Sequence, residues 1–134
     1  MARLLIVDDD RDLLDGQKAF LEGKGYAVET ALSVEEGLAR AAETHPDLII
    51  ADLMMEHYDS GFVFCKKVRD LPGLAKVPIV MQTAAPRKIG FTFDAGASPG
   101  GDWMKADEVL TKPVPLEHLL GTIEKHLSGR RAHA

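Results

Sequence analysis

Residues 3–10 read RLLIVDDD, a short apolar run that ends in three consecutive aspartates. The unbroken apolar residues after Arg3 predict a buried β-strand over Arg3–Val7. Three adjacent carboxylates repel one another and need a reason to be there. Acidic residues are favoured at the start of a helix, which is the ordinary explanation for such a run. A cation held by the same carboxylates is the alternative.

Similar apolar runs recur along the chain between segments with helical spacing. We predict further strands over Tyr26–Ala31, Asp47–Ala51, Val77–Met81 and Glu108–Thr111. We predict helices over Arg11–Lys24, from a Ser33 cap to about Glu43, over Gly61–Leu71, and from near Pro115 onward. The last helix should bury Leu116, Leu119, Leu120, Ile123 and Leu127. Nearly all-apolar strands that alternate with helices predict an α/β protein with a doubly wound, five-stranded parallel sheet.

Composition narrows the classes of function. The 134 residues carry a formal net charge of -5, which argues against direct binding to nucleic acid or to an anionic membrane surface. Cys65 is the single cysteine, lies on an apolar helix face and is expected in the core. The first apolar run is too short for a signal peptide, so we expect a cytoplasmic protein without membrane insertion. Residues 1–128 should form one domain and residues 129–134 a flexible tail.

The residues that follow the strands carry the predicted chemistry. In an open parallel sheet, ligands bind beyond the carboxyl ends of the strands. Asp8 and Asp9 follow the first strand, Asp52 the third, Thr83 the fourth and Lys112 the fifth. Carboxylate oxygens suit Mg²⁺, and a carboxylate can attack a phosphoryl group while a lysine and a hydroxyl contact its oxygens. Each residue alone has an ordinary structural explanation, but their joint placement predicts an aspartyl phosphate site.

Four stretches together resemble the response-regulator receiver domain, a family that includes the chemotaxis response regulator. They are LLIVDDD (4–10), PDLIIADLMM (46–55), PIVMQTAA (78–85) and LTKPV (110–114). The resemblance covers nearly the whole chain and implies a flavodoxin-like receiver fold. It also implies a metal site for Mg²⁺ formed by Asp8, Asp9, Asp52 and the backbone carbonyl of Met54.

The resemblance assigns the remaining site residues. Asp52 matches the phosphoacceptor, Thr83 the hydroxyl residue that moves toward the phosphoryl group, and Ala84 the small residue beside it. Lys112 matches the family's lysine, which a cis peptide joins to the following proline, here Pro113. The phosphoryl donor would be a sensor histidine kinase or a phosphotransfer protein, and the downstream effector is unknown. The chain would act as a signalling phosphoacceptor that stands alone, without an output domain, and not as an enzyme on other substrates.

The sequence departs from the family in three places. Met55-Glu56 replaces the usual Met-Pro, and Val109 stands where the family commonly has Tyr or Phe. The spacing from Thr83 to Lys112 is longer than usual, which implies an atypical fourth-helix region. The Gly content of residues 86–107 predicts an irregular segment that holds the partner specificity.

Two alternative functions stay open. Asp8 and Asp10 form an Asp-x-Asp after the first strand, as in aspartate-nucleophile phosphohydrolases of the haloacid dehalogenase type. Against this, Arg11-Asp12 follow where Thr or Val is expected, and the chain has no segment for a cap domain. The second alternative is a binding module that keeps the receiver fold without being phosphorylated.

Overall fold

The structure is a computed structural model that describes residues 2–52, 60–83 and 106–132. Its strands are β1 (Arg3–Val7), β2 (Ala27–Ala31), β3 (Leu48–Asp52), β4 (Ile79–Thr83) and β5 (Glu108–Thr111). Its helices are α1 (Arg11–Gly23), α2 (Val34–Thr44), α3 (Ser60–Arg69) and α5 (Leu116–Ala132).

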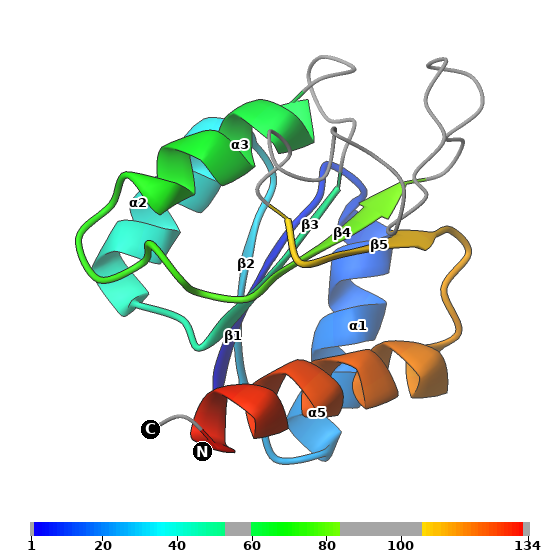
Figure 1. The fold of residues 1–134 in the computed structure, drawn as a ribbon. Helices are drawn as coiled ribbons and strands as arrows, with labels where there is room; N and C mark the ends of the chain where they lie inside the picture. Colours follow the sequence, from blue (N-terminus) through cyan, green and yellow to red (C-terminus); the bar gives the residue numbers. More distant parts are fainter. Residues whose placement is uncertain (1, 53–59, 84–105, 133–134) are drawn as a thin grey trace.

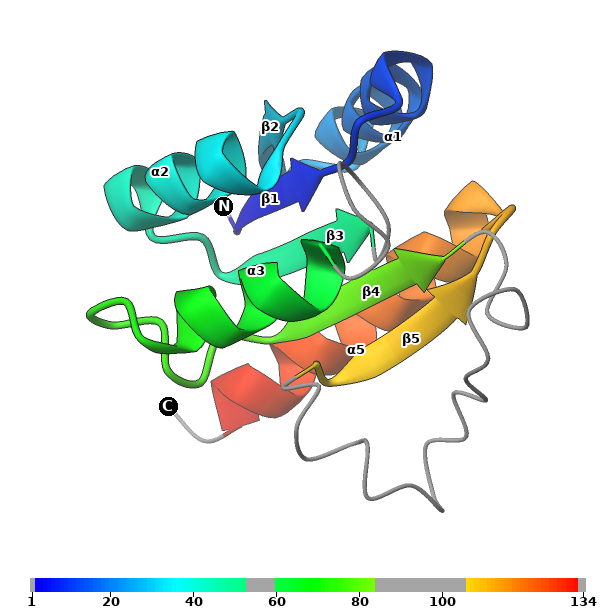
Figure 2. The ribbon, with the colours of Figure 1, turned by 90° about the horizontal axis from the view of Figure 1, so that it is seen from above.

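The strands form one parallel sheet in the order β2-β1-β3-β4-β5. Helices α2 and α3 cover one face, and α1 and α5 cover the other (Figures 1 and 2). This is the predicted doubly wound architecture, with the strand order of the flavodoxin-like fold. The order reverses between β1 and β3, so the carboxyl ends of these two strands mark the position where such folds bind ligands.

Each face of the sheet has its own apolar core. The α2/α3 side contains Leu5, Val7 and Phe64, and the α1/α5 side contains Leu4, Ile6 and Ile123, all fully buried. Adjacent residues of β1 therefore enter opposite cores, as the two-residue repeat of a strand requires. Cys65 lies in the first core as predicted, and burial raises the pKa of its thiol to about 12.

Two helix starts follow from local side-chain capping. Ser33 accepts a hydrogen bond from Glu36 N at 3.1 Å, and Glu36 Oε1 accepts one from Leu32 N at 3.2 Å. The predicted capping pair is therefore present, although Glu36 reaches the residue before the cap. Asp10 caps α1 by accepting a hydrogen bond from Leu13 N at 3.2 Å. Each cap satisfies a backbone N–H group that the helix cannot pair internally.

The structure corrects several predicted boundaries. Strand β4 begins at Ile79, two positions after the predicted start at Val77, because Pro78 has no N–H group for the sheet. Strand β3 includes Asp52 as its last residue. Leu116 is 37% exposed, since the buried stripe of α5 begins only three residues later, at Leu119. Helix α5 reaches Ala132, so residues 129–132, expected in a tail, are helical.

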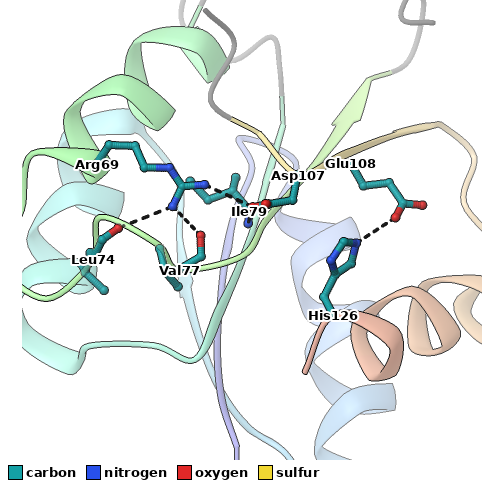
Figure 3. Close-up of polar contacts among 7 residues, drawn as sticks. All are labelled: Arg69, Leu74, Val77, Ile79, Asp107, Glu108 and His126. Atoms are coloured by element: carbon teal, nitrogen blue, oxygen red, sulfur yellow. Dashed lines mark hydrogen bonds and ion pairs between the residues drawn. The ribbon is translucent and has the colours of Figure 1, made fainter. Parts of the chain in front are cut away.

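The amino ends of β4 and β5 are joined to α3 by one carboxylate (Figure 3). Asp107 Oδ2 accepts hydrogen bonds from Ile79 N at 2.8 Å and from Arg69 Nη2 at 3.1 Å. The Arg69 guanidinium also donates to the carbonyl oxygens of Leu74 and Val77. These contacts tie the strand ends to the loop that follows α3.

A second polar cluster joins β5 to α5. Glu108 Oε1 lies 2.8 Å from both Lys125 Nζ and His126 Nε2. Figure 3 shows the Glu108–His126 contact. Burial by itself would raise the pKa of Glu108, but the hydrogen bonds and charges of Lys125 and His126 outweigh it and lower the pKa.

Within the described residues, no helix has the length and apolar character needed to cross a bilayer. The prediction of an irregular segment over 86–107 falls mainly outside the described residues.

Candidate functional site

The carboxyl edge of the sheet gathers three carboxylates. Asp8 follows β1 directly, Asp9 comes next, and Asp52 ends β3, which pairs with β1. One oxygen from each of the three side chains lies within 4.8 Å of the others. Asp8 is fully buried, Asp52 is 6% exposed and Asp9 is exposed. The sequence prediction that these residues meet is confirmed.

One lysine neutralises part of this charge. Lys112 Nζ donates a hydrogen bond to Asp8 Oδ2 at 2.8 Å and lies 3.4 Å from Asp52 Oδ2. Burial alone would lower the pKa of Lys112, but the hydrogen bond to Asp8 and the negative charge of Asp52 outweigh it, and the pKa is raised. The ammonium is therefore charged at neutral pH. The peptide bond between Lys112 and Pro113 is cis, as the resemblance implied.

Asp8 is held in place from two directions. Its Oδ1 accepts a hydrogen bond from Asp10 N at 2.9 Å, while its Oδ2 accepts from Lys112. Asp10 in turn uses its side chain to cap α1. The three aspartates thus have different surroundings: Asp8 is fixed by the protein, Asp10 caps the helix start, and Asp9 is exposed.

The Thr83 side chain completes the described part of the site. It ends β4, is fully buried, and its Oγ1 has no hydrogen-bond partner among the residues that the structure describes. Buried hydroxyl groups are nearly always hydrogen-bonded, so an unpaired one calls for an explanation. Met54 and Ala84 lie outside the described residues, and their predicted roles stay predictions.

The donor set fits a magnesium ion. Three carboxylates face a single described ammonium, which leaves an excess of negative charge. The cluster offers hard oxygen donors, without a thiolate or imidazole among the three grouped side chains. Mg²⁺ prefers such donors and commonly combines one or two carboxylates with water and phosphate oxygens.

The sequence interpretation missed one buried polar pair next to this site. Gln17 on α1 and Gln82 on β4 are each 1% exposed and hydrogen-bond to each other. Gln17 occupies a position between Leu14 and Leu21 on the buried face of its helix, where an apolar residue is expected. A polar residue at a core position was the available indication, but its partner lies 65 positions away in sequence.

Comparison with known proteins agrees with the fold. Residues 4–124 match the sequence model of the response regulator receiver domain. The chain is 37% identical over 126 residues to the DNA-binding dual master transcriptional regulator RpaA of Synechocystis, covering 92% of this chain and 48% of that protein. It is 30% identical to protein PilG of Pseudomonas aeruginosa, covering 93% of this chain and 87% of that one. The chain thus spans about half of the first relative and most of the second.

Solved structures give the same result. A CheY-like receiver domain protein from Methanospirillum hungatei superposes with a TM-score of 0.81 at 29% identity, covering 100% of this chain and 99% of the other. The chemotaxis response regulator CheY4 of Vibrio cholerae gives a TM-score of 0.78 at 34% identity, covering 93% and 98%. Fold and site define a receiver domain of two-component signalling. The chain belongs to the response regulator receiver domain family.

Proposed function

We propose that this receiver domain is a phosphoacceptor switch that takes a phosphoryl group onto Asp52 in the presence of Mg²⁺. The observation that carries the proposal is the Lys112 ammonium, which lies 2.8 Å from Asp8 Oδ2 and 3.4 Å from Asp52 Oδ2. Strand β4 ends in the buried Thr83 hydroxyl, which has no partner among the described residues. A structural salt bridge alone would not explain the additional carboxylate.

The transfer would proceed by nucleophilic attack. A carboxylate oxygen of Asp52 forms a bond to phosphorus as the bond from phosphorus to the donor breaks, and the donor leaves with the electron pair. With a phosphohistidine donor, the bond that breaks is phosphorus–nitrogen and the imidazole is released. Lys112 would contact one phosphoryl oxygen, and Thr83 would donate its hydroxyl hydrogen to another.

A bound Mg²⁺ would neutralise the carboxylates and polarise a phosphoryl oxygen. Asp9 and Asp52 are the better candidates for direct ligands. Both oxygens of Asp8 already accept hydrogen bonds, from Asp10 N and from Lys112, so we propose that Asp8 supports the site without displacing these partners. The backbone carbonyl of Met54 remains a proposed ligand on the basis of the resemblance.

We propose a sensor histidine kinase or a phosphotransfer protein as donor, because receiver domains of response regulators are phosphorylated by histidine kinases. The phosphohydrolase alternative has less support, since it needs Asp10 as a second catalytic acid. The side chain of Asp10 instead accepts the hydrogen bond that caps α1.

Acetyl phosphate provides a test without the kinase. Intact mass should show one added phosphoryl group when Mg²⁺ is present and none when it is chelated. Asp52→Asn should abolish the addition, whereas the matched control Asp47→Asn, at the opposite edge of the sheet, should not. A phosphoryl group that persists in Asp52→Asn would overturn the proposal.

Asp9→Ala and Asp8→Ala separate the two acidic roles. Titration with Mg²⁺ should show a larger loss of affinity for Asp9→Ala, because Asp9 is exposed and Asp8 is engaged by the protein. Equal losses would mean that both residues ligate the ion in the same way.

A further inference from the structure

The buried amide pair Gln17–Gln82 lies among apolar side chains. Gln17 Nε2 donates to Gln82 Oε1 at 3.1 Å, and Gln82 Nε2 donates to Gln17 Oε1 at 3.3 Å. Both side chains are 1% exposed, on the sheet face covered by α1 and α5. The neighbours on that face, such as Leu14 and Val80, are fully or almost fully buried and apolar. Among the residues that the structure describes, the two amides therefore depend on each other for hydrogen bonding.

The pair is adjacent to the phosphoacceptor site on both of its elements. Gln82 directly precedes Thr83 and is the cross-strand register partner of Asp52. Register partners project to the same face of a sheet, so the Gln82 side chain lies beside that of Asp52. At the other end, Gln17 belongs to the helix that begins just after Asp8 and Asp9. The pair thus links the strand that ends in Thr83 to the helix that follows the acidic residues.

Stability alone does not account for this pair. Removing one amide leaves the other buried without a partner, which is costly, but replacing both by apolar groups of similar size is nearly neutral. Two leucines would fill the same space. What the amides add is direction, because hydrogen bonds restrict relative position and rotation more than apolar contacts do.

We propose that Gln17 and Gln82 are a positioning pair for phosphorylation. By fixing the carboxyl end of β4 against α1, the pair holds the Thr83 hydroxyl at a set position relative to Asp52 and the acidic residues after β1. This inference rests on the proposed phosphoacceptor function and assigns to the pair an effect on the rate of transfer that acts through Thr83.

The test uses the full chain with Gln17→Leu and Gln82→Leu together. Its urea unfolding midpoint should stay close to that of the native protein. With acetyl phosphate and Mg²⁺, the maximum rate of phosphorylation should fall about fivefold to tenfold, while the donor concentration for half-maximal rate changes little. Thr122→Val is the matched control. It removes a buried hydroxyl on the same side, but that hydroxyl donates only within its own helix, to His118 O at 3.1 Å, so the rate should be native.

A second comparison separates positioning from general loosening. In a Thr83→Ala background, the two leucine substitutions should cause no further loss of rate, because the group that they position is gone. A further loss in that background, or a native rate in the leucine variant, would overturn the positioning role. If the native protein takes up no phosphoryl group at all, the proposed function fails together with this inference. If the native protein is phosphorylated and the leucine variant reacts at the same rate, only the positioning role fails.

Discussion

The two edges of the sheet use the same side chain for different purposes. At the amino edge, two aspartates are each engaged by the backbone of a strand. Asp47 Oδ2 accepts a hydrogen bond from Arg3 N at 2.8 Å, and Asp107 Oδ2 accepts one from Ile79 N at 2.8 Å as well as the Arg69 guanidinium. These carboxylates fix the alignment of strand ends.

At the carboxyl edge, three aspartates come together around one described cation. Asp8, Asp9 and Asp52 each place an oxygen within 4.8 Å of the others, and Lys112 lies between two of them. The fold does not need this arrangement, because clustered like charges disfavour the folded chain. Asp8 also accepts a backbone N–H, from Asp10 at 2.9 Å, so the difference between the two edges is the crowding of carboxylates at the carboxyl edge.

The largest expected effect concerns the lysine of the carboxyl edge. Lys112→Met should lower the rate of phosphorylation by acetyl phosphate about 100-fold, because it removes the charge that faces the phosphoryl oxygens. Lys125→Met is the control, since Lys125 pairs with Glu108 and should leave the rate unchanged. Initial rates from intact mass measure both, and a loss of less than threefold for Lys112→Met would break the comparison.

Substituting an aspartate by alanine should lower stability at the amino edge but not at the carboxyl edge. Asp107→Ala leaves Ile79 N and Arg69 without their carboxylate and should lower the free energy of unfolding by about 2 kcal/mol. Asp52→Ala removes one charge from the crowded cluster and should leave that free energy unchanged or raise it in Mg²⁺-free buffer. Urea unfolding at neutral pH measures both. A larger loss for Asp52→Ala would show that the carboxyl edge is also structural.

Packing beneath the carboxyl edge can be tested through a glycine. A methyl group at Gly37 would lie 2.9 Å from both Phe64 Cε1 and Val7 Cγ2, and Val7 directly precedes Asp8. Gly37→Ala should therefore be about 1–2 kcal/mol less stable than Gly16→Ala. At Gly16, a methyl meets nothing within 4 Å, so the substitution changes only the helix propensity, which is higher for Ala than for Gly. Equal thermal denaturation midpoints for the two variants would contradict this account of the packing.

The smallest expected effect is a difference in pH dependence. The folded protein lowers the pKa of Glu108. Its contribution to stability is therefore present above the pKa of the unfolded chain, about 4.3, and is lost as the pH falls through the pKa of the folded protein. Glu108→Gln should then cost less than about 1 kcal/mol at pH 7, and the difference should shrink in acid.

Lys112 behaves in the opposite sense. Because the folded protein raises the pKa of Lys112, the contribution of Lys112 to stability is present below about pH 10.4. It is lost as the pH rises through the pKa of the folded protein. Urea midpoints measured across pH test both directions. If the urea midpoints of the native protein and of Glu108→Gln fell equally in acid, the expectation for Glu108 would be contradicted.

The fold was predictable because its determinants are local. Apolar runs such as Arg3–Val7 and the capping pair Ser33–Glu36 specify their own structure. The joint placement of Asp8, Asp52 and Lys112 then followed from the rule that parallel strands share a carboxyl edge.

Other features depend on contacts between distant segments, which no local pattern encodes. The Gln17–Gln82 pair spans 65 positions, and the Arg69–Asp107 bond spans 38. Even Leu116, at a position with correct helical spacing, was predicted wrongly, because burial depends on where the helix meets the sheet.

The central claim is that Asp52, and no other aspartate, receives the phosphoryl group. It is tested most directly by locating the modification after treatment with acetyl phosphate and Mg²⁺. Borohydride reduces an aspartyl phosphate to homoserine, and peptide mass spectrometry then identifies the residue. The account predicts homoserine at position 52 in the native protein, and at no position in the Asp52→Asn variant. Homoserine at position 8, 9 or 107 would contradict it.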